Sequence, residues 1–400
     1  MIHFVPIRLQ LALQRTNPMP LLSPFPSRRH CGFTAGIMLR FAGIILMSTV
    51  ATQTFASDPA PAFIWERLPD LPDPIGLKGM YAGVSHGHIL LAGGSNFPVP
   101  NREGGAKTFA RNILVRPADA APGVEWRVIE QKLPVGQSEG SSVTTESGVV
   151  LIGGQGATGA RDGVFLLSWD EATSSIRRQK LPALPQACAN TAAVCHDGSV
   201  YVAGGDFRGR GLAQFLRLDL AKAMSHPDDA SWEVLPSWPG PPRFGAALSA
   251  LRVDGREQLV LFGGRVKAMA PAALADYLDD GYCFDPSEQS WHALAPMPHP
   301  ALLAAAVRID ASRLAIMGGS DGHDLERMAE LGDRYRLPDR IVVYDAGEDR
   351  WREAGTMPVG AVGVAVAALD HGWLLAGGEY SPGLRTPRTY CVAVEGEASR

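Results

Sequence analysis

The chain has 400 residues and a formal net charge of -4, and it is rich in glycine (44 residues) and proline (31 residues). A nearly neutral chain offers neither the basic surface that nucleic acid requires nor a strongly acidic tail, so partners must be inferred from local sites. Abundant turn residues without long helical patterns favour many short strands over a helical fold.

The N-terminal segment differs from the rest of the chain. Residues 41–50 form a short apolar run, and the small residues Thr54 and Ala56 follow it at the spacing of a signal-peptide cleavage site. The run is too short for a stable membrane span. We therefore expect residues 38–56 to be a signal peptide, which leaves an exported protein with no stable membrane insertion after cleavage.

The segment upstream of that signal, residues 1–37, has no periodic pattern and contains several arginines and prolines. We expect translation to begin at Met38 and residues 1–37 to reflect an error in the assigned gene start. The alternative is a disordered N-terminal tail that precedes a membrane anchor.

Four cysteines remain after the signal, and they do not form a metal-binding pattern. There is no CxxC motif and no cysteine and histidine cluster at metal-ligand spacing, so we expect no metal site. Cys188 and Cys195 are close enough in sequence to pair if their loop allows it. The alternative is four separate thiols, with Cys283 and Cys391 as the other two.

A single sequence pattern occurs six times. Each copy is an apolar run that ends in Gly-Gly, and the first glycines stand 60, 51, 59, 55 and 59 residues apart. The six copies are 89–94, 149–154, 200–205, 259–264, 314–319 and 373–378. A period near fifty, with a buried strand closed by Gly-Gly, is typical of kelch repeats. The sequence therefore predicts an all-β fold, a six-bladed kelch-type β-propeller over residues 62–395.

Each repeat carries the other strands of a blade. A strand of small residues, such as 245–250, precedes each Gly-Gly strand and suits the crowded centre of the ring. Five repeats also carry a tryptophan, which we expect to pack between neighbouring blades; these are Trp65, Trp126, Trp232, Trp291 and Trp351. In the second repeat Ile176 stands where the tryptophan would be.

The order of the strands predicts how the ring closes. The repeats begin with a lone tryptophan strand, 63–68, and end after a third strand, 389–394. We expect the N-terminal strand to complete the last blade, because that pairing removes a free sheet edge.

Function in a propeller depends on the loops at one mouth of the channel. The loops that follow Gly-Gly and those that lead into the inner strands should open on the same face. Three of the former are unusual: 95–107 is long and polar, 320–338 contains an amphipathic stretch that predicts a short helical lid, and 379–386 carries a specific motif.

The motif Gly378-Glu379-Tyr380-Ser381-Pro382-Gly383-Leu384-Arg385-Thr386 resembles the G-E-x-x-P-G-L-R-T segment of the periplasmic N-acetylneuraminate (sialic acid) epimerases, or mutarotases. Residues 79–83 and 92–98 are similar to a second segment of that family. Here the second segment opens the chain, so the order of the blades looks cyclically permuted. The resemblance extends over residues 62–395 and implies a periplasmic isomerase that acts on a small-molecule sugar acid.

The resemblance implies that Glu379 and Arg385 are catalytic. Mutarotation delivers a proton to the ring oxygen and removes one from the anomeric hydroxyl, and a carboxylate performs both steps in turn. A guanidinium recognises the substrate carboxylate through two parallel hydrogen bonds. This chemistry requires no cofactor. The alternative is that the two residues form only a loop salt bridge.

Four other residues are candidates for substrate binding. Asn96 and Phe97 lie in the second family-like segment, and Lys78 leads into the first inner strand. Arg243 leads into the fourth inner strand, although kelch repeats also use such an arginine structurally.

Two further hypotheses remain open beside the sialic acid mutarotase. One is a non-catalytic kelch module that binds carbohydrate or protein, and the other is a mutarotase for another sugar acid. A sialidase is excluded because there is no S-x-D-x-G-x-x-W repeat, and no motif supports a copper radical oxidase.

Overall fold

A computed structural model describes residues 60–267 and 273–396. Residues 1–57 and 58–400 form separate units, and only the second contains described residues. The expected signal peptide at 38–56 and the upstream segment 1–37 therefore lie outside the described residues. Within the described part, no helix combines the length and the apolar character needed to cross a membrane.

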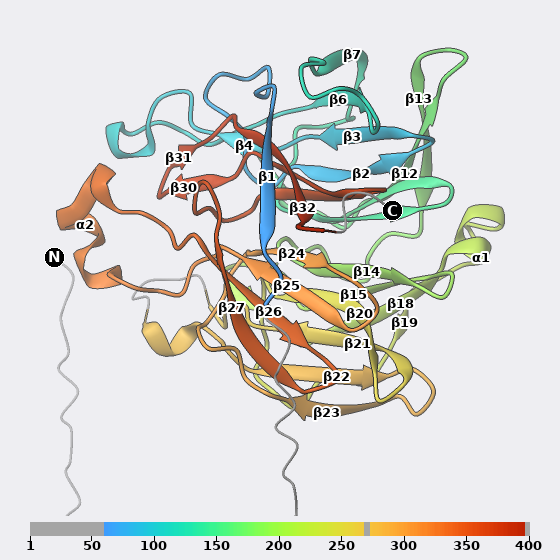
Figure 1. The fold of residues 1–400 in the computed structure, drawn as a ribbon. Coiled ribbons are helices and arrows are strands. Elements are labelled where there is room, and N and C mark those ends of the chain that lie inside the picture. The colour runs from blue at the N-terminus through green and yellow to red at the C-terminus, as the bar shows by residue number, and fades with distance from the viewer. Residues whose placement is uncertain (1–59, 268–272, 397–400) are drawn as a thin grey trace, which may run out of the picture. The chain divides into compact units, whose positions relative to one another are not determined.

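The fold is a six-bladed β-propeller, as the sequence predicts (Figure 1). Each blade is an antiparallel sheet of four strands, named here from the channel outward. Blade 1 contains β2 (Tyr81–Ser85), β3 (His88–Ala92), β6 (Asn112–Pro117) and β7 (Arg127–Lys132). Blade 2 contains β8 (Ser141–Thr145), β9 (Gly148–Ile152), β12 (Val164–Asp170) and β13 (Ser175–Leu181). Blade 3 contains β14 (Ala192–His196), β15 (Ser199–Ala203), β18 (Phe215–Asp219) and β19 (Glu233–Val234).

The remaining three blades have the same order. Blade 4 contains β20 (Ala247–Val253), β21 (Arg256–Phe262), β22 (Gly281–Asp285) and β23 (Ser290–Leu294). Blade 5 contains β24 (Ala305–Arg308), β25 (Arg313–Met317), β26 (Arg340–Asp345) and β27 (Arg350–Thr356). Blade 6 contains β28 (Ala365–Leu369), β29 (Gly372–Ala376), β32 (Thr389–Val394) and β1 (Phe63–Leu68).

Short elements lie in the connections. Four two-stranded ribbons follow Gly-Gly pairs: β4 (Ser95–Asn96) with β5 (Thr108–Phe109), β10 (Gln155–Gly156) with β11 (Gly159–Ala160), β16 (Asp206–Phe207) with β17 (Arg210–Gly211), and β30 (Glu379–Ser381) with β31 (Leu384–Arg385). The helical turns are η1 (Asn101–Glu103), α1 (Leu220–Ser225), η2 (Leu274–Asp276), η3 (Leu325–Arg327), α2 (Met328–Leu331) and η4 (Gly332–Arg334). The predicted helical stretch of the 320–338 loop is thus present as η3 and α2.

The N-terminal strand closes the ring as expected. β1 pairs antiparallel with β32 from Phe63 opposite Val394 to Leu68 opposite Thr389. Figure 1 shows β1 beside β32, so both ends of the propeller meet in blade 6. This pairing removes the free edge that β32 would otherwise present.

The six largest apolar clusters of the described core lie one at each contact between neighbouring blades. Val150 of blade 2, for example, packs in one cluster with Leu216 of blade 3, and both are almost fully buried. Each such side chain contributes about 1.5–3 kcal/mol by leaving water. Stability therefore comes from stacking one blade on the next.

The tryptophans join the blades. The indole nitrogen of Trp126 donates to the carbonyl oxygen of Pro69 in the preceding blade at 3.1 Å. Trp232, Trp291 and Trp351 make equivalent bonds to the blades before them. Blade 2 lacks the tryptophan, and there the side chain of Gln131 accepts from the nitrogen and donates to the oxygen of Ile176.

Glycine is required where the Gly-Gly strands end. Gly93 has a φ of +69°, and a Cβ added there would lie 2.3 Å from the carbonyl oxygen of Gln137 in the next blade. A residue with a Cβ does not fit so close to the backbone of the next blade, which explains why Gly-Gly recurs in all six repeats. The end of the channel at which these pairs lie is called the mouth below.

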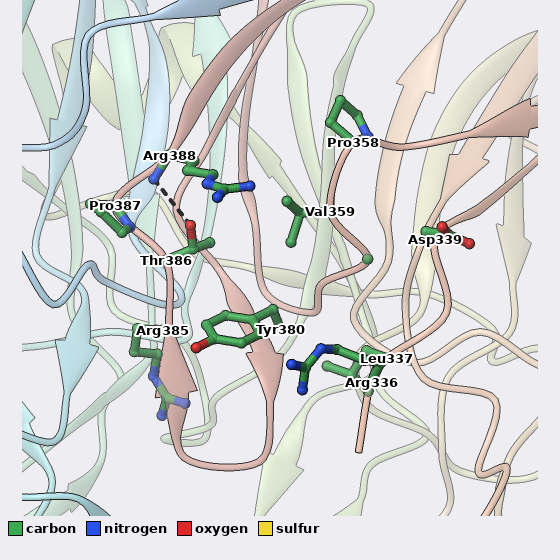
Figure 2. Close-up of a pocket in the computed structure, with 11 residues that line it drawn as sticks. Arg336, Leu337, Asp339, Pro358, Val359, Tyr380, Arg385, Thr386, Pro387 and Arg388 are labelled. Atoms are coloured by element: carbon green, nitrogen blue, oxygen red, sulfur yellow. Dashed lines mark hydrogen bonds between the residues drawn. The ribbon is translucent and has the colours of Figure 1, made fainter. Parts of the chain in front are cut away.

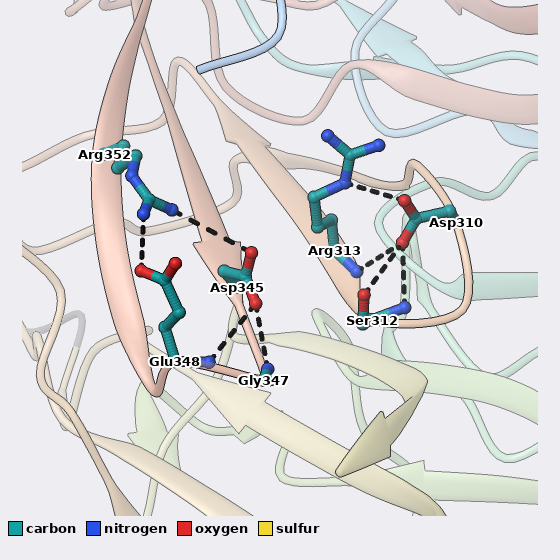
Figure 3. A network of polar contacts seen from close by, with 7 residues as sticks. All are labelled: Asp310, Ser312, Arg313, Asp345, Gly347, Glu348 and Arg352. Atoms are coloured by element: carbon teal, nitrogen blue, oxygen red, sulfur yellow. Dashed lines mark hydrogen bonds and ion pairs between the residues drawn. The ribbon is translucent and has the colours of Figure 1, made fainter. Parts of the chain in front are cut away.

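Tight turns connect the strands of blade 5 at the end opposite the mouth. In blade 5, Asp310 accepts from the backbone nitrogens of Ser312 and Arg313, each at 2.8 Å (Figure 3). Asp345 accepts from the nitrogen of Gly347 at 2.9 Å in the next turn of the same blade. These aspartates satisfy turn nitrogens, so their role is structural.

All four described cysteines are free thiols. Cys188 and Cys195 are not bonded to each other, which agrees with the separate thiols that the sequence left open. Burial raises the pKa of the Cys188 thiol to about 11, despite a hydrogen bond from Gln214. A thiol with such a pKa is unreactive at neutral pH.

Candidate functional site

A closed ring of backbone hydrogen bonds surrounds the mouth. One residue of each blade donates its N–H to the carbonyl of the equivalent residue in the preceding blade, with N···O distances of 2.5 to 2.9 Å. The ring residues are Gly79, Glu139, Asn190, Gly245, Leu303 and Gly363. Standard bond lengths place neighbouring Cα atoms within about 7 Å of one another, and opposite ones within ~14 Å. The ring is therefore about as wide as one small molecule.

Every ring residue has a left-handed backbone, with φ between 52 and 66°. Glycine adopts this conformation freely, and three blades use it. Glu139, Asn190 and Leu303 adopt it at a cost of roughly 1–2 kcal/mol each. A charged residue in this conformation at the mouth indicates a functional constraint, because strain of this kind gathers at binding and catalytic sites.

The residue after each Gly-Gly pair occupies a second set of equivalent positions. Each pairs in antiparallel fashion with the residue that directly precedes the ring residue of its own blade. In blade order these positions hold Ser95, Gln155, Asp206, Arg265, Ser320 and Glu379. The two groups of loops therefore meet on one face, as predicted, and the same backbone position carries different chemistry in each blade.

Blade 6 brings the two predicted catalytic residues together. Glu379 and Arg385 are directly opposite in the β30–β31 ribbon, and the Arg385 guanidinium donates to the Glu379 carboxylate. The N–H of Gly383 donates to the other Glu379 oxygen at 3.3 Å. The loop thus fixes the orientation of the carboxylate from two sides.

Arg385 is held from blade 1 as well. Its guanidinium lies over the ring of Phe97, 5.0 Å from the ring centre, and its Nε approaches the carbonyl oxygen of Ser95 at 3.4 Å. Burial lowers the Arg385 pKa, and the neighbouring Glu379 and Glu139 charges counteract part of that effect. Phe97 is therefore a platform for the Arg385 guanidinium, and substrate binding by Phe97 stays a prediction.

Lys78 links two carboxylates of different blades. Its Nζ lies 3.3 Å from Glu379 Oε2 and 3.7 Å from Glu139 Oε1. Lys107, from the long loop of blade 1, approaches the same Glu139 oxygen at 2.7 Å. Three cations and two carboxylates thus share the mouth between blades 6, 1 and 2.

The charges in this cluster shift the pKa of Glu139. Burial alone would raise the pKa of this almost enclosed carboxyl group, but Lys78, Lys107 and Arg385 outweigh it and hold the pKa below its ordinary value. Burial also lowers the pKa of Lys107, and the Glu139 carboxylate opposes that effect. Glu139 is therefore the charged centre on which the lysines converge.

Asn96 is close to the cluster, but its side chain is engaged with the protein. Its amide nitrogen donates to Asp73 Oδ2 at 3.0 Å, and its amide oxygen accepts from the Thr108 hydroxyl at 2.8 Å. Asn96 is buried, with 5 % of its surface exposed. These bonds hold the start of the long loop, so substrate binding by Asn96 stays a prediction.

Arg243 lies apart from these residues, in blade 4. Its side chain is fully buried, pairs with both oxygens of Asp280 at 2.6 and 2.7 Å, and donates to the carbonyl oxygen of Gly263 at 3.0 Å. The rings of Trp238 and Tyr282 flank it, each 5.4 Å away. This geometry favours the structural role that the sequence left open for Arg243.

A pocket of about 540 Å³ adjoins the outer side of the motif loop, between blades 5 and 6. Figure 2 shows Tyr380 in the pocket, with Arg336 near its ring and the Arg385 guanidinium turned away from Arg388. Arg336 lies 5.6 Å from the centre of the Tyr380 ring. Arg385 is thus also one of the residues that line this pocket.

Sequence reasoning missed Glu139 and Lys107. Lys107 lies in the long loop noted above, but nothing in the pattern around it indicates contact with blade 2. Glu139 offers a clearer signal, because alignment of the six repeats places it where three blades have glycine. Among the described residues no group of histidine, cysteine, aspartate and glutamate side chains is arranged to hold a metal ion.

Comparisons with known proteins agree with the fold and with the family that the sequence resembles. The chain matches the Kelch motif family over residues 255–298. It is 28% identical over 242 residues to an N-acetylneuraminate epimerase of Yersinia pestis (strain Pestoides F), which covers 54% of this chain and 58% of the relative. A protein of the same name from Salmonella arizonae is 27% identical over 243 residues, or 54% of this chain and 59% of the relative. The match thus spans little more than half the length of these relatives.

The solved structure described as "Structure of YjhT" has a TM-score of 0.59 and covers 82% of this chain and 97% of that chain. At 17% identity this likeness shows the fold alone. A partial match in sequence beside a nearly complete match in fold is what a cyclic permutation of blades would produce, although the permutation itself stays a prediction. The named relatives and the Kelch motif thus show what this chain is similar to, and the structural neighbour agrees with the propeller fold.

Proposed function

We propose that this protein is a mutarotase that accelerates the exchange of α and β anomers of N-acetylneuraminate, with Glu379 as the acid and base. The observation that carries the proposal is the Glu379 carboxylate, which is fixed by Arg385 and Gly383 at the mouth while 15% of its side chain remains exposed. A small-molecule sugar acid is the substrate, and the proposal requires no cofactor.

The reaction requires two proton transfers at one carbon. As the hemiketal opens, the anomeric hydroxyl loses its proton, the bond from the anomeric carbon to the ring oxygen breaks, and the ring oxygen gains a proton. Glu379 takes the first proton and delivers the second, directly or through one water molecule. Rotation of the open ketone and the reverse steps close the ring on the other face.

The surrounding charges suit an anionic substrate. Lys78, Lys107 and Arg385 supply three positive charges against the two carboxylates of Glu139 and Glu379. The excess positive charge attracts a sugar acid to the mouth. Lys78 Nζ also lies 3.3 Å from Glu379 Oε2 and so helps to orient the carboxylate that takes the first proton.

The test follows the decay of the α-anomer after its release by a sialidase, using proton NMR. The protein should accelerate the decay over buffer, and Glu379→Gln should reduce the catalysed rate by ~100-fold or more. Glu395→Gln, an exposed glutamate of the same blade, is the matched control and should retain full activity. A rate equal to buffer for the wild type would overturn the proposal.

The same experiment separates the competing hypotheses. A protein that binds N-acetylneuraminate without accelerating its exchange would be a non-catalytic binding module. Acceleration with a different sugar acid, but not with N-acetylneuraminate, would identify a mutarotase of other specificity. If Glu379→Gln and Arg385→Ala both retained full activity, the site would be wrong while the function stood.

We also propose that the protein is exported to the periplasm. The support is the pattern of residues 38–56, which resembles a signal peptide with a cleavage site. Expression of the chain from Met38 with a periplasmic fractionation and N-terminal sequencing tests this. A mature N-terminus near Ser57 in the periplasmic fraction is expected, and retention of an uncleaved chain in the cytoplasm would contradict it.

A further inference from the structure

Blade 4 contains two buried arginines that differ in their hydrogen-bond partners. Arg243 has an acidic partner, a carbonyl acceptor and two flanking rings. Arg265 is also buried, with 9% of its surface exposed, but its Nε and Nη2 have no hydrogen-bond acceptor among the residues that the structure describes. The second arginine is therefore a positive charge with two unused donors.

An unused donor in a protein interior is costly, and the cost is higher when the group is charged. Native structures keep few such groups, and each requires an explanation such as a ligand or ion. Among the described acidic residues of this blade, Asp280 pairs with Arg243, and Asp276 is engaged with Lys267 and the N–H of Ala273. Within the described part of the chain the two donors of Arg265 therefore have no acceptor, which a ligand at the mouth would supply.

The identity of the two unused donors indicates the chemistry of that molecule. The Nε–H and the Nη2–H project side by side from one edge of the planar guanidinium. Two parallel donors at this spacing match the two oxygens of a carboxylate. Tyr277 holds the plane of the guanidinium from one face, with its ring centre 4.7 Å away. Tyr277 is itself packed against Phe244 and Leu302.

Arg265 stands at the mouth, in the position that Glu379 occupies in blade 6. Both residues directly follow a Gly-Gly pair and make the same antiparallel bridge to the residue before the ring. Only blade 5 separates them, and its equivalent residue is the small Ser320. A single molecule at the mouth is therefore able to meet both side chains, because the Cα atoms of the six ring residues lie within ~14 Å of one another.

Other polar atoms at the mouth are also unused. Ser95 Oγ, Ser138 Oγ and Asp206 Oδ1 are buried without a hydrogen-bond partner in the described part of the chain. Ser95 and Asp206 occupy the same position as Arg265 in blades 1 and 3, and Ser138 directly precedes the ring residue Glu139. Unmet polar groups of both signs around one ring suit a ligand rich in hydroxyl groups.

We propose that Arg265 binds the carboxylate of the sugar acid through its Nε and Nη2 donors, while Glu379 faces the reacting carbon from blade 6. This inference rests on the proposed function for the identity of the ligand. Arg385, which is already bonded to Glu379 and to the Ser95 carbonyl oxygen, then acts as a positioning residue for Glu379. Because the Nε and Nη2 atoms are buried, the proposal requires the Arg265 side chain to reorient toward the mouth when the ligand binds.

The test measures equilibrium binding of N-acetylneuraminate by calorimetry, together with the melting temperature of the free protein. Arg265→Met should weaken binding by at least ~10-fold, because it removes a charge-assisted pair of hydrogen bonds. It should not lower the melting temperature of the free protein, because it removes a buried charge that has no partner. Arg265→Lys should also weaken binding, because a lysine retains the charge but not the two parallel donors.

Two variants of the same blade serve as controls. Arg243→Met should lower the melting temperature strongly, because it leaves Asp280 unpaired. Arg256→Met, at a side chain that is 67% exposed, should change neither quantity. A neutral N-acetylhexosamine should bind the wild type and Arg265→Met equally weakly, because it lacks the carboxylate.

The outcomes separate this inference from the proposed function. If the wild type accelerates anomer exchange and Arg265→Met binds the sugar acid as tightly as the wild type, the inference is overturned and the function stands. If the wild type binds the sugar acid without accelerating its exchange, and Arg265→Met weakens that binding, the function fails and the carboxylate site stands. A fall in the melting temperature of free Arg265→Met comparable to that of Arg243→Met would show a structural arginine and overturn the inference.

Discussion

Lys107 Nζ lies 2.7 Å from Glu139 Oε1 and so joins the long loop of blade 1 to the ring residue of blade 2. Glu139 is nearly enclosed and adopts a left-handed backbone with a φ of 59°. Lys78 approaches the same oxygen from the other side and continues to Glu379. The two predicted catalytic residues are therefore supported by an acid and a lysine that come from neighbouring blades.

The first prediction concerns the stability that Glu139 provides. Glu139→Gln should lower the free energy of unfolding by about 3 kcal/mol, because it leaves buried cations without their counter-charge. Glu146→Gln, at an exposed residue of the same blade, should have an effect of less than about 0.5 kcal/mol. Denaturant unfolding at pH 7 measures both, and equal stabilities of the two variants would contradict the assignment.

The second prediction is the pH dependence of that difference. The pKa of Glu139 in the folded protein lies below its ordinary value of 4.5, so its charged form stabilises the fold at all pH values above 4.5. This stabilisation is lost as the pH falls through the lowered pKa. The gap in melting temperature between the wild type and Glu139→Gln should therefore be constant near neutrality and should narrow below pH 4.5. A gap that widens on acidification would show that the sign is wrong.

The third prediction tests the ring. Gly79 has a φ of +66°, and an added Cβ would lie 2.8 Å from the backbone nitrogen of Glu139 and 2.9 Å from its Cγ. Gly79→Ala should lower stability by more than about 2 kcal/mol and should reduce activity, because it displaces Glu139. Gly87 is a matched control, since its φ is +73° and an added Cβ would meet nothing within 4 Å. Gly87→Ala should cost only about 1 kcal/mol and leave activity intact. Similar activity losses in both variants would contradict this account.

The fourth prediction separates the charge of Arg385 from its geometry. Arg385→Lys retains a positive charge beside Glu379 but loses the stacking on Phe97 and the fixed direction of the guanidinium donors. We expect the catalysed rate of anomer exchange to fall by ~10-fold, the equivalent of one charge-assisted hydrogen bond. Arg350→Lys, at an exposed arginine of blade 5, should retain the wild-type rate. Full activity of Arg385→Lys would show that only the charge matters.

The sequence predicts the blades well because their determinants are local and repeated. A Cβ at Gly93 would meet the carbonyl oxygen of Gln137, and the same restriction recurs at each Gly-Gly pair. Strand alternation and turn residues around these pairs therefore define six equivalent units. The closure by β1 also follows from the sequence, because one strand precedes the first blade and the last blade has only three strands of its own.

The mouth is harder to predict, because its contacts join residues that are distant in sequence. Lys107 and Glu139 meet across blades, and no local pattern connects a polar loop to a residue 32 positions later. Asn96 and Arg243 illustrate the opposite case, since each has the expected position but an engaged side chain. Whether a polar side chain at the mouth is hydrogen-bonded within the protein or can contact a ligand depends on its neighbours in three dimensions. Alignment of the repeats by their Gly-Gly pairs would nevertheless have singled out Glu139 as a charged residue at a ring position and Arg265 as a charged residue directly after Gly-Gly.

The fifth prediction concerns the closure of the ring by β1. Deletion of residues 60–68 exposes the whole edge of β32, from Thr389 to Val394, and removes Leu68 from its buried position. Loss of Leu68 alone costs about 1.5–3 kcal/mol, and the lost hydrogen bonds add to this, so we expect the melting temperature to fall by about 5–10 °C. The exposed edge should also promote association of chains, which light scattering detects.

A circular permutant is the matched control, because the carbonyl oxygen of Ala62 already accepts from the nitrogen of Glu395 at 2.9 Å. A short linker between the two ends, with new termini at the exposed turn of Asp254 and Gly255, retains β1 beside β32 and should preserve the melting temperature. A deletion variant as stable and monomeric as the wild type would show that β1 does not close the ring in solution.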